Sequence, residues 1–163
     1  MITTDGQLGL LKALRQHFTF VKQQRCIAHK MRNMVVKLKR PQKNPCADEA
    51  RLIWGAPTRK EAVRRFKDWE KRWYPEAESA VRCMRKNLYA CLRYYDLPEE
   101  QWKMVRTTNI LERSFREVRR RTRPIPPTGG FPNERSAQRI FYGISKYLNQ
   151  NWNRPKIEFT QNS

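Results

Sequence analysis

The chain has 163 residues and a formal net charge of +20 at pH 7, so it is long enough to bury a hydrophobic core and is strongly basic. This charge favours nucleic acid as a partner, with an anionic membrane surface second. No stretch approaches the ~18 uninterrupted apolar residues of a membrane span, and no signal peptide opens the chain, so we expect a soluble intracellular protein. The four cysteines are irregularly spaced, which is typical of reduced thiols rather than of a disulfide framework.

The first third of the chain predicts strands that alternate with helices. β-prone residues lead into the turn signal Asp5-Gly6, and leucines at helical spacing follow. Later apolar positions return to helical spacing until Pro41, and Gln42 to Pro45 is expected to be a short linker. In order we expect a strand at 1–4, a helix at 8–18, a strand at 19–26, a helix at 28–40 and a helix at 47–54.

The middle of the chain predicts a helical hairpin. Thr58-x-x-Glu61 is a capping box that begins one helix, and Pro75 suits the first turn of the next. We interpret the apolar stripes of both helices as core, because aromatic residues at helical spacing are usually buried. These stripes are Ala62, Phe66, Trp69 and Trp73, followed by Ala77, Val81, Met84, Leu88, Cys91 and Tyr95.

After the hairpin, the pattern is mixed. A short helical turn is expected around Trp102 and a strand-like segment at 104–106. Beyond an arginine-rich helix, prolines and glycines between Pro124 and Pro132 predict a connector that is neither helix nor central strand. A last amphipathic helix is expected at 137–148, with a polar tail from Asn149 onward.

The arginine-rich helix is the feature around which the rest of the chain is organised. Asn109 and Glu112 read as a capping box, and Leu111, Phe115 and Val118 give it a narrow apolar face. The other faces are almost all guanidinium, opposed only by Glu112 and Glu117. A solvated charge face is the usual fate of such a run, but this density repels itself unless a polyanion lies alongside. We therefore expect phosphate contacts.

Two carboxylates are candidates for phosphoryl-transfer chemistry. Asp5 follows a strand, and Glu112 lies in the first turn of a helix. Carboxylates suit Mg²⁺, and two such ions can hold the attacking and leaving oxygens of a phosphodiester. Each also has an ordinary structural explanation, because Asp-Gly is usually a turn and Glu112 completes a cap.

Cys26-x-x-His29 has the spacing of half a zinc site, since thiolate and imidazole can bind one ion. The other half is not evident. Cys83 and Cys91 fall on the apolar side of a helix, where a buried thiol is the ordinary expectation.

Three linked motifs make the chain resemble the C-terminal part of mutator-type insertion-sequence transposases. The first is Thr4-Asp5-Gly6 with its leucine-rich helix, the second is the run 24–33 around Cys26-Ile27-Ala28-His29, and the third runs from Thr107 to Thr122. The resemblance implies an α/β fold that is predominantly helical, an incomplete ribonuclease-H-like catalytic core with a helical insertion. It implies residues 1–40 as the second half of that core, 41–100 as the insertion, 101–152 as its C-terminal part and 153–163 as a polar tail.

The resemblance also implies roles for individual residues. Asp5 resembles the second and Glu112 the third carboxylate of the family's Asp-Asp-Glu triad, which would hold two Mg²⁺ or Mn²⁺ ions. The Cys-x-x-His motif lies beside the family's active site and is thought to help handle DNA, which displaces the zinc interpretation. The residues expected to contact DNA are Cys26, His29, Arg32, Asn109, Arg113, Arg116, Arg119, Arg120 and Arg123.

The strand that bears the family's first catalytic Asp is expected to be missing, because only four residues precede Asp5. We therefore expect a truncated transposase that binds insertion-sequence ends but does not cut them alone, in the bacterial cytoplasm at the nucleoid. Two alternatives stay open: a basic nucleic-acid-binding protein without catalysis, and a regulator that forms oligomers or pairs with full-length transposase. The first predicts that replacing Asp5 and Glu112 changes no activity, and the second predicts co-purification with the enzyme.

Overall fold

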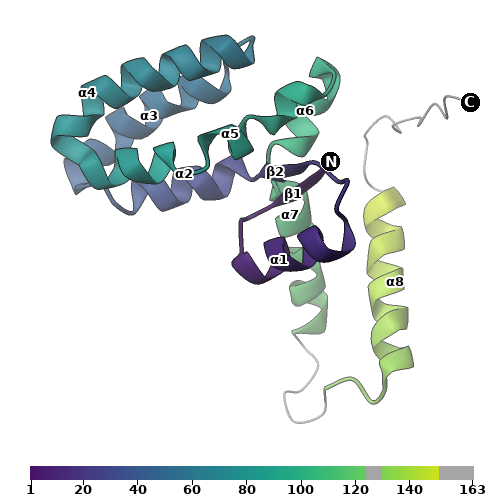
Figure 1. Ribbon diagram of the computed structural model, residues 1–163. Coiled ribbons are helices and arrows are strands. Elements are labelled where there is room, and N and C mark those ends of the chain that lie inside the picture. Colours follow the sequence, from purple (N-terminus) through teal and green to yellow (C-terminus); the bar gives the residue numbers. More distant parts are fainter. Residues whose placement is uncertain (124–129, 151–163) are drawn as a thin grey trace, which may run out of the picture. The chain divides into compact units, whose positions relative to one another are not determined.

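The computed structural model of the chain describes residues 1–123 and 130–150 (Figure 1). These residues are predominantly helical, with one two-stranded parallel sheet. They form two compact units, Met1–Asn109 and the part from Ile110 onward. The elements are β1 (Ile2–Thr4), α1 (Leu8–His17), β2 (Gln23–Arg25), α2 (Ile27–Val35), η1 (Arg40–Gln42), α3 (Lys43–Trp54), α4 (Arg59–Arg85), α5 (Leu88–Cys91), η2 (Arg93–Asp96), α6 (Glu99–Val105), α7 (Asn109–Thr122) and α8 (Glu134–Gln150).

The parallel sheet pairs β1 with β2, and Thr3 lies opposite Gln24. The crossover between them contains α1, as the leucine spacing predicts. The strand expected at 19–26 is wrong in length, because only Gln23–Arg25 pairs with β1 while Phe20 is fully exposed. Gln24 is fully buried, and its amide binds the Cys91 carbonyl and the Tyr94 N–H at 2.8 Å each. The sheet is thereby attached to the helical core.

The helical core of the first unit is formed by α2, α3 and α4, together with α5 and η2. Helix α3 begins at Lys43 rather than near Ala47, so the expected linker at 42–45 is wrong. Pro45 sits in the first turn of α3, where a missing backbone N–H costs no helical hydrogen bond. Helix α2 ends at Val35, six residues before Pro41.

Helix α4 is two helical arms joined by a kink at Ala77, where φ is −144° and ψ is 45°. Arg85 donates a hydrogen bond to Glu70 at 2.7 Å, although residues 15 apart in a straight helix are separated by about 22 Å. The chain therefore folds back at the kink, visible at the end of α4 in Figure 1, and the predicted hairpin is confirmed. The exposed backbone carbonyl of Glu76 accepts a hydrogen bond from Gln42 at 3.2 Å.

The second arm is shorter than the apolar stripe predicts. Asn87 has a left-handed φ of 67°, which ends α4 before the short helix α5 begins. The expected core positions of both arms are buried, except Tyr95, which is partly buried.

Buried aromatic residues confirm the core interpretation, because their polar atoms bind within the protein. Trp69 donates to the Cys46 carbonyl at 3.2 Å and Trp73 to the Glu49 carboxylate at 2.8 Å. Tyr94 donates to the Trp54 carbonyl at 3.1 Å. A buried ring whose N–H or O–H is already satisfied is typical of structure rather than of ligand binding.

The segment 104–106 is not a strand, because α6 continues to Val105. It nevertheless borders the sheet. The hydroxyl of Thr3 donates to the Val105 carbonyl, and the Ile27 N–H donates to the Arg106 carbonyl at 3.0 Å. The sequence signal for a strand reflected this half-buried position rather than strand pairing.

The second unit contains most of α7 and all of α8. Helix α7 begins at Asn109, as predicted, but none of its residues is buried, and Leu111 and Phe115 are more than half exposed. Helix α8 buries Ile144 and extends to Gln150, so the polar tail does not begin at Asn149 as expected. Residues 124–129 of the proline-rich connector and the tail beyond 150 lie outside the described residues. No helix in the described part of the chain is long and apolar enough to cross a membrane.

Candidate active site and nucleic-acid interface

Asp5 lies at the carboxyl end of β1 and is exposed. One of its oxygens accepts the Gln7 N–H at 2.9 Å, and Gln7 in turn caps α1 by accepting the Leu10 N–H at 2.7 Å. Gly6 has a φ of 87°, which favours glycine. The Asp-Gly pair is therefore a turn, as its ordinary explanation requires, and it also presents a carboxylate at the edge of a parallel sheet, where ligands usually bind.

The Cys-x-x-His motif follows β2 at the same edge. The Cys26 N–H donates to the Thr4 carbonyl at 2.7 Å, so Cys26 comes directly beside the end of β1. The thiol of Cys26 is fully buried and accepts the Thr108 N–H at 3.2 Å. The Thr108 hydroxyl lies 3.3 Å from both the Cys26 sulfur and Nδ1 of His29. The motif therefore holds the residue that immediately precedes α7.

His29 also lies 3.4 Å from an Arg32 guanidinium nitrogen through Nε2. The structure thus brings together three predicted site residues, Cys26, His29 and Arg32. Contact between Cys26 and DNA stays a prediction, and the Cys26 thiol is fully buried in the structure.

Within residues 1–123 and 130–150, no three His, Cys, Asp or Glu side chains gather as metal ligands do. A zinc site at Cys26 and His29 would need further ligands of that kind. Cys46 and Cys91 are buried, and burial raises their pKa to about 11 and about 12, which keeps both thiols protonated near neutral pH.

Glu112 lies in the first turn of α7 and is partly exposed. Asn109 begins the same helix and is exposed. A carboxylate in the first turn interacts favourably with the positive end of the helix dipole. Asp5 belongs to the first unit, directly after β1, and Glu112 belongs to the second unit, in α7.

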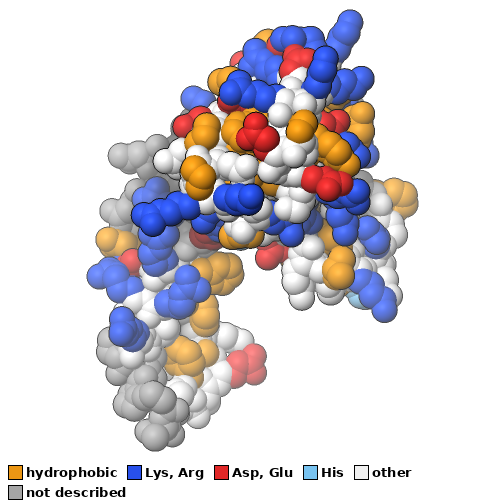
Figure 2. Space-filling model, turned by 90° about the vertical axis from the view of Figure 1, so that its left-hand side faces the viewer, with side chains coloured by type: hydrophobic (Ala, Val, Ile, Leu, Met, Phe, Trp, Pro, Cys, Tyr) orange, Lys and Arg blue, Asp and Glu red, His pale blue; other side chains and the backbone are white. Residues whose placement is uncertain are grey.

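The arginines of α7 divide into two groups. Arg120 and Arg121 each donate to Glu117, at 2.7 Å, and these hydrogen bonds lower the Glu117 pKa to about 2. A second group is exposed and has no acidic partner in the described part of the chain. It consists of Arg113, Arg116, Arg119 and Arg123. Figure 2 shows Lys and Arg side chains spread across the visible face of the molecule.

Lys30 and Arg25 are residues that the sequence interpretation missed. Lys30 is buried, and its ammonium donates to the carbonyls of Cys83 and Lys86 at the end of α4. Burial lowers the pKa of Lys30 below its ordinary value. Arg25 packs against Gly6 so closely that a Cβ at position 6 would lie 1.7 Å from a guanidinium nitrogen. Both side chains belong to the motif run 24–33, but their partners are distant in sequence.

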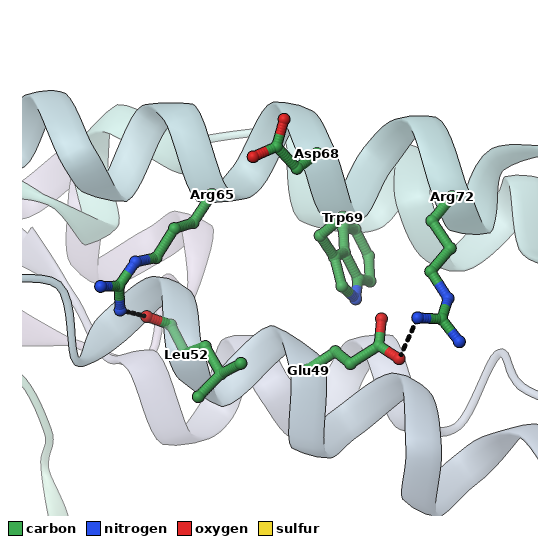
Figure 3. A pocket seen from close by; sticks show the side chains of 6 residues that line it. All are labelled: Glu49, Leu52, Arg65, Asp68, Trp69 and Arg72. Atoms are coloured by element: carbon green, nitrogen blue, oxygen red, sulfur yellow. Dashed lines mark hydrogen bonds and ion pairs between the residues drawn. The ribbon is translucent and has the colours of Figure 1, made fainter.

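A pocket of about 510 Å³ between α3 and α4 is a poor candidate for chemistry (Figure 3). Its charged side chains bind within the protein: Arg72 pairs with Glu49 at 3.0 Å, and Arg65 donates to the Leu52 carbonyl at 2.8 Å. Trp69 at its wall is a core residue. The pocket is a seam between two packed helices.

Comparison with known protein families gives a match over residues 1–155 to the family described as "Transposase, Mutator family". The chain belongs to the Mutator family of transposases. Because the match covers both units, it includes the sheet edge with Asp5 as well as α7 with Glu112.

Individual insertion-sequence transposases are similar to this chain over most of its length. The chain is 31% identical over 158 residues to the transposase for insertion sequence element IS406 of Burkholderia multivorans, covering 96% of this chain and 40% of that protein. It is 28% identical over 149 residues to that for IS905 of Lactococcus lactis, covering 91% of this chain and 37% of that protein. It is 32% identical over 118 residues to the transposase for insertion sequence element IST2 of Acidithiobacillus ferrooxidans, covering 72% of this chain and 40% of that protein. The chain thus spans about two fifths of the length of these relatives.

Proposed function

We propose that this chain supplies two carboxylates, Asp5 and Glu112, to the DNA-cleaving site of an insertion-sequence transposase with a ribonuclease-H-like core. The observation that carries the proposal is the position of Asp5 at the carboxyl end of β1, beside the Cys-x-x-His motif at the end of β2. Parallel strands present catalytic groups at this edge. Family membership supplies the reaction class.

The two carboxylates fit divalent metal ions in their chemistry, because hard oxygen ligands suit Mg²⁺ and Mn²⁺. Asp5 is exposed and uses one oxygen for the Gln7 N–H, so a carboxylate lone pair remains for a cation. When bound, such ions lower the pKa of the attacking hydroxyl and stabilise charge on the leaving oxygen.

In the proposed reaction, a hydroxyl oxygen attacks the phosphorus of a DNA phosphodiester. A new P–O bond forms as the bond to the leaving 3′ oxygen breaks in line. The attacking hydroxyl loses its proton to solvent, and the leaving oxygen takes up a proton from solvent. No covalent protein intermediate is involved. Arg113, Arg116 and Arg119 hold phosphate oxygens of the backbone, while His29 and Arg32 contact DNA beside the scissile bond.

By themselves, the 163 residues bind DNA without cutting it. The chain offers two carboxylates, Asp5 and Glu112, to the proposed site, and two carboxylates give less ligand charge and poorer geometry than a triad. A nick that requires Mg²⁺ or Mn²⁺ in DNA carrying insertion-sequence ends, abolished by Glu112→Gln, would overturn this part of the proposal.

Metal binding tests the carboxylate assignment without relying on activity. Titration with Mn²⁺ is expected to broaden the NMR signals of residues around Asp5 and Glu112, and Asp5→Asn or Glu112→Gln removes the effect at its own site. Glu100→Gln is the matched control, because Glu100 is an exposed carboxylate in the first turn of α6. Broadening that is no stronger around Asp5 and Glu112 than around Glu100 contradicts the assignment.

The second candidate function is DNA binding without any catalytic role, and the unpaired arginines of α7 favour it. It predicts that Asp5→Ala and Glu112→Ala do not change DNA affinity. It also predicts that neither replacement changes the activity of a longer transposase that contains these residues. Loss of strand cleavage in such a transposase on either replacement removes this candidate.

A further inference from the structure

A basic groove in the first unit, distinct from the arginines of α7, lies between β2, α2 and the second arm of α4. Its volume is about 590 Å³. Five cationic residues line it: Arg25, Lys30, Lys37, Arg82 and Lys86. Asn33, Ser79 and Asn87 add amide and hydroxyl groups, and among the described residues no acidic side chain lines the groove.

The cations of the groove have different partners. Lys30 is bound to the carbonyls at the end of α4, and Arg82 pairs with Glu78 at 2.7 Å. Lys37 and Lys86 are exposed, and their ammonium groups have no partner within the described residues. Two cations at the groove surface are therefore available to an anion.

Arg25 provides an independent sign of a missing counter-charge. Its Nε is buried and has no hydrogen-bond partner in the described part of the chain. A buried donor on a charged group costs free energy unless it is paired, so such groups usually have a ligand or an acid beside them. Here neither an aspartate nor a glutamate pairs with Arg25 among the described residues.

The groove begins next to the candidate catalytic carboxylate. Gly6, which follows Asp5, lines the groove, and the Arg25 guanidinium packs against it. Leu8, at the start of α1, is 82% exposed and offers an apolar surface at the same place. An anionic strand that occupies the groove therefore passes beside Asp5.

We propose that this groove binds one nucleotide of a single DNA strand, with its phosphate against Lys37, Lys86 and Arg25 and its base against Leu8 and the groove's amides. The inference rests on the proposed function and adds to it a second backbone-binding surface, built within the first unit from residues other than the arginines of α7.

The size of the groove favours a single strand over a duplex. Sites that enclose one small ligand have volumes of roughly 300–1,000 Å³, and the groove falls within this range. A duplex presents both backbones across a major groove of about 12 Å and cannot place a nucleotide inside so small a space. An apolar side chain such as Leu8 makes no hydrogen bond that distinguishes one base from another. We therefore expect the groove to tolerate different sequences, as single-strand binding proteins usually do.

The test compares two double variants that remove the same charge. Lys37→Ala/Lys86→Ala alters the groove, whereas Lys67→Ala/Lys71→Ala alters two exposed lysines on the first arm of α4. Affinity for a single-stranded oligothymidine is measured by fluorescence anisotropy at several salt concentrations. We expect the groove variant to bind roughly five- to tenfold more weakly, with a salt slope lower by about 1.4, and the control to change less than about twofold.

Lysine acetylation of the wild-type chain, read by mass spectrometry, gives a second measurement. Oligothymidine is expected to protect Lys37 and Lys86 but not Lys67 and Lys71. Equal losses of affinity in the two variants, or no protection of the groove lysines, overturn the proposal. Protection by inorganic phosphate that equals protection by oligothymidine also overturns it, because the groove is then a small-anion site.

The outcomes separate this inference from the proposed function. If the oligonucleotide binds and the groove lysines stay reactive, the groove assignment fails while the carboxylate site stands. If the groove lysines are protected but Mn²⁺ does not affect Asp5 or Glu112, the groove stands and the carboxylate site fails.

Discussion

Two arginine-rich helices of this chain use the same residue type for different purposes. All six arginines of α4 pair with acidic side chains, and eight residues of that helix are buried. In α7 no residue is buried, and only Arg120 and Arg121 pair with an acid in the described part of the chain. An arginine count therefore says little about function until the partner of each guanidinium is known.

The largest expected difference between the helices is in stability. Trp69→Ala removes a buried ring of α4 and should lower the free energy of unfolding by about 3–5 kcal/mol. Phe115→Ala in α7 should change it by less than about 0.5 kcal/mol, because Phe115 is 55% exposed. Urea denaturation followed by circular dichroism measures both. Equal destabilisation would mean that α7 packs as α4 does.

DNA affinity should show the reverse order. Arg113, Arg116 and Arg119 of α7 have no acidic partner among the described residues. Replacing all three with alanine should weaken binding roughly tenfold or more and lower the duplex salt slope by about 2.7. The control replaces Lys60, Lys67 and Lys71, three exposed lysines of α4, and removes the same charge. Similar losses in both variants would show that net charge alone governs binding.

The contact that precedes α7 has a smaller expected effect. Cys26→Ala leaves the Thr108 N–H without its acceptor, which should cost about 1–2 kcal/mol of unfolding free energy. Cys26→Ser keeps an acceptor and should recover part of that loss. Hydrogen exchange of the Thr108 amide measures this hydrogen bond directly. If the amide is equally protected from exchange in Cys26→Ala, the Cys26 sulfur is not its acceptor.

The smallest effect concerns two carboxylates with the same shift. Hydrogen bonds from arginines lower the pKa of Glu61 in α4 and of Glu117 in α7 to about 2. A carboxyl group whose pKa is lowered on folding stabilises the fold at pH values above its ordinary pKa of 4.5. This stabilisation is lost as the pH falls toward 2. Glu61 and Glu117 should therefore lose it in the same acid range.

Binding of DNA should separate the two groups. Phosphates that engage Arg120 and Arg121 weaken their bonds to Glu117, so the Glu117 pKa should rise while the Glu61 pKa stays near 2. Carboxyl NMR titration with and without oligothymidine, which lacks acid-labile purines, measures the difference. A Glu117 pKa that does not move would mean that these two arginines do not contact the backbone.

Local signals in the sequence predicted much of the fold. The Thr58 capping box is present, with its hydroxyl accepting the Glu61 N–H at 3.1 Å, and the aromatic stripe behind it is buried. These features depend on residues three to eleven positions apart. By contrast, the start of β2 and the break at Asn87 depend on which distant segments are available for pairing, so the sequence pattern overextended both elements.

The candidate site was predictable as a set of motifs but not as a set of contacts. Asp5 and the Cys-x-x-His motif could be named from the sequence. That the Cys26 sulfur accepts the N–H of Thr108 joins residues 82 positions apart, and no local rule indicates it. Lys30 resembled any surface lysine of a basic helix, because its carbonyl partners lie 53 and 56 positions away.

The buried thiol of Cys26 also provides a natural probe of local opening. Cys26 is fully buried and its sulfur contacts Thr108, so a thiol reagent can reach it only after local opening, and we expect the rate of alkylation at Cys26 to report the opening of the segment that contains Thr108. Cys46 and Cys91 lie in the helical core, where labelling requires the core itself to open. Three buried sulfurs can thus record, in one labelling time course, whether the Thr108 segment is released before the core opens.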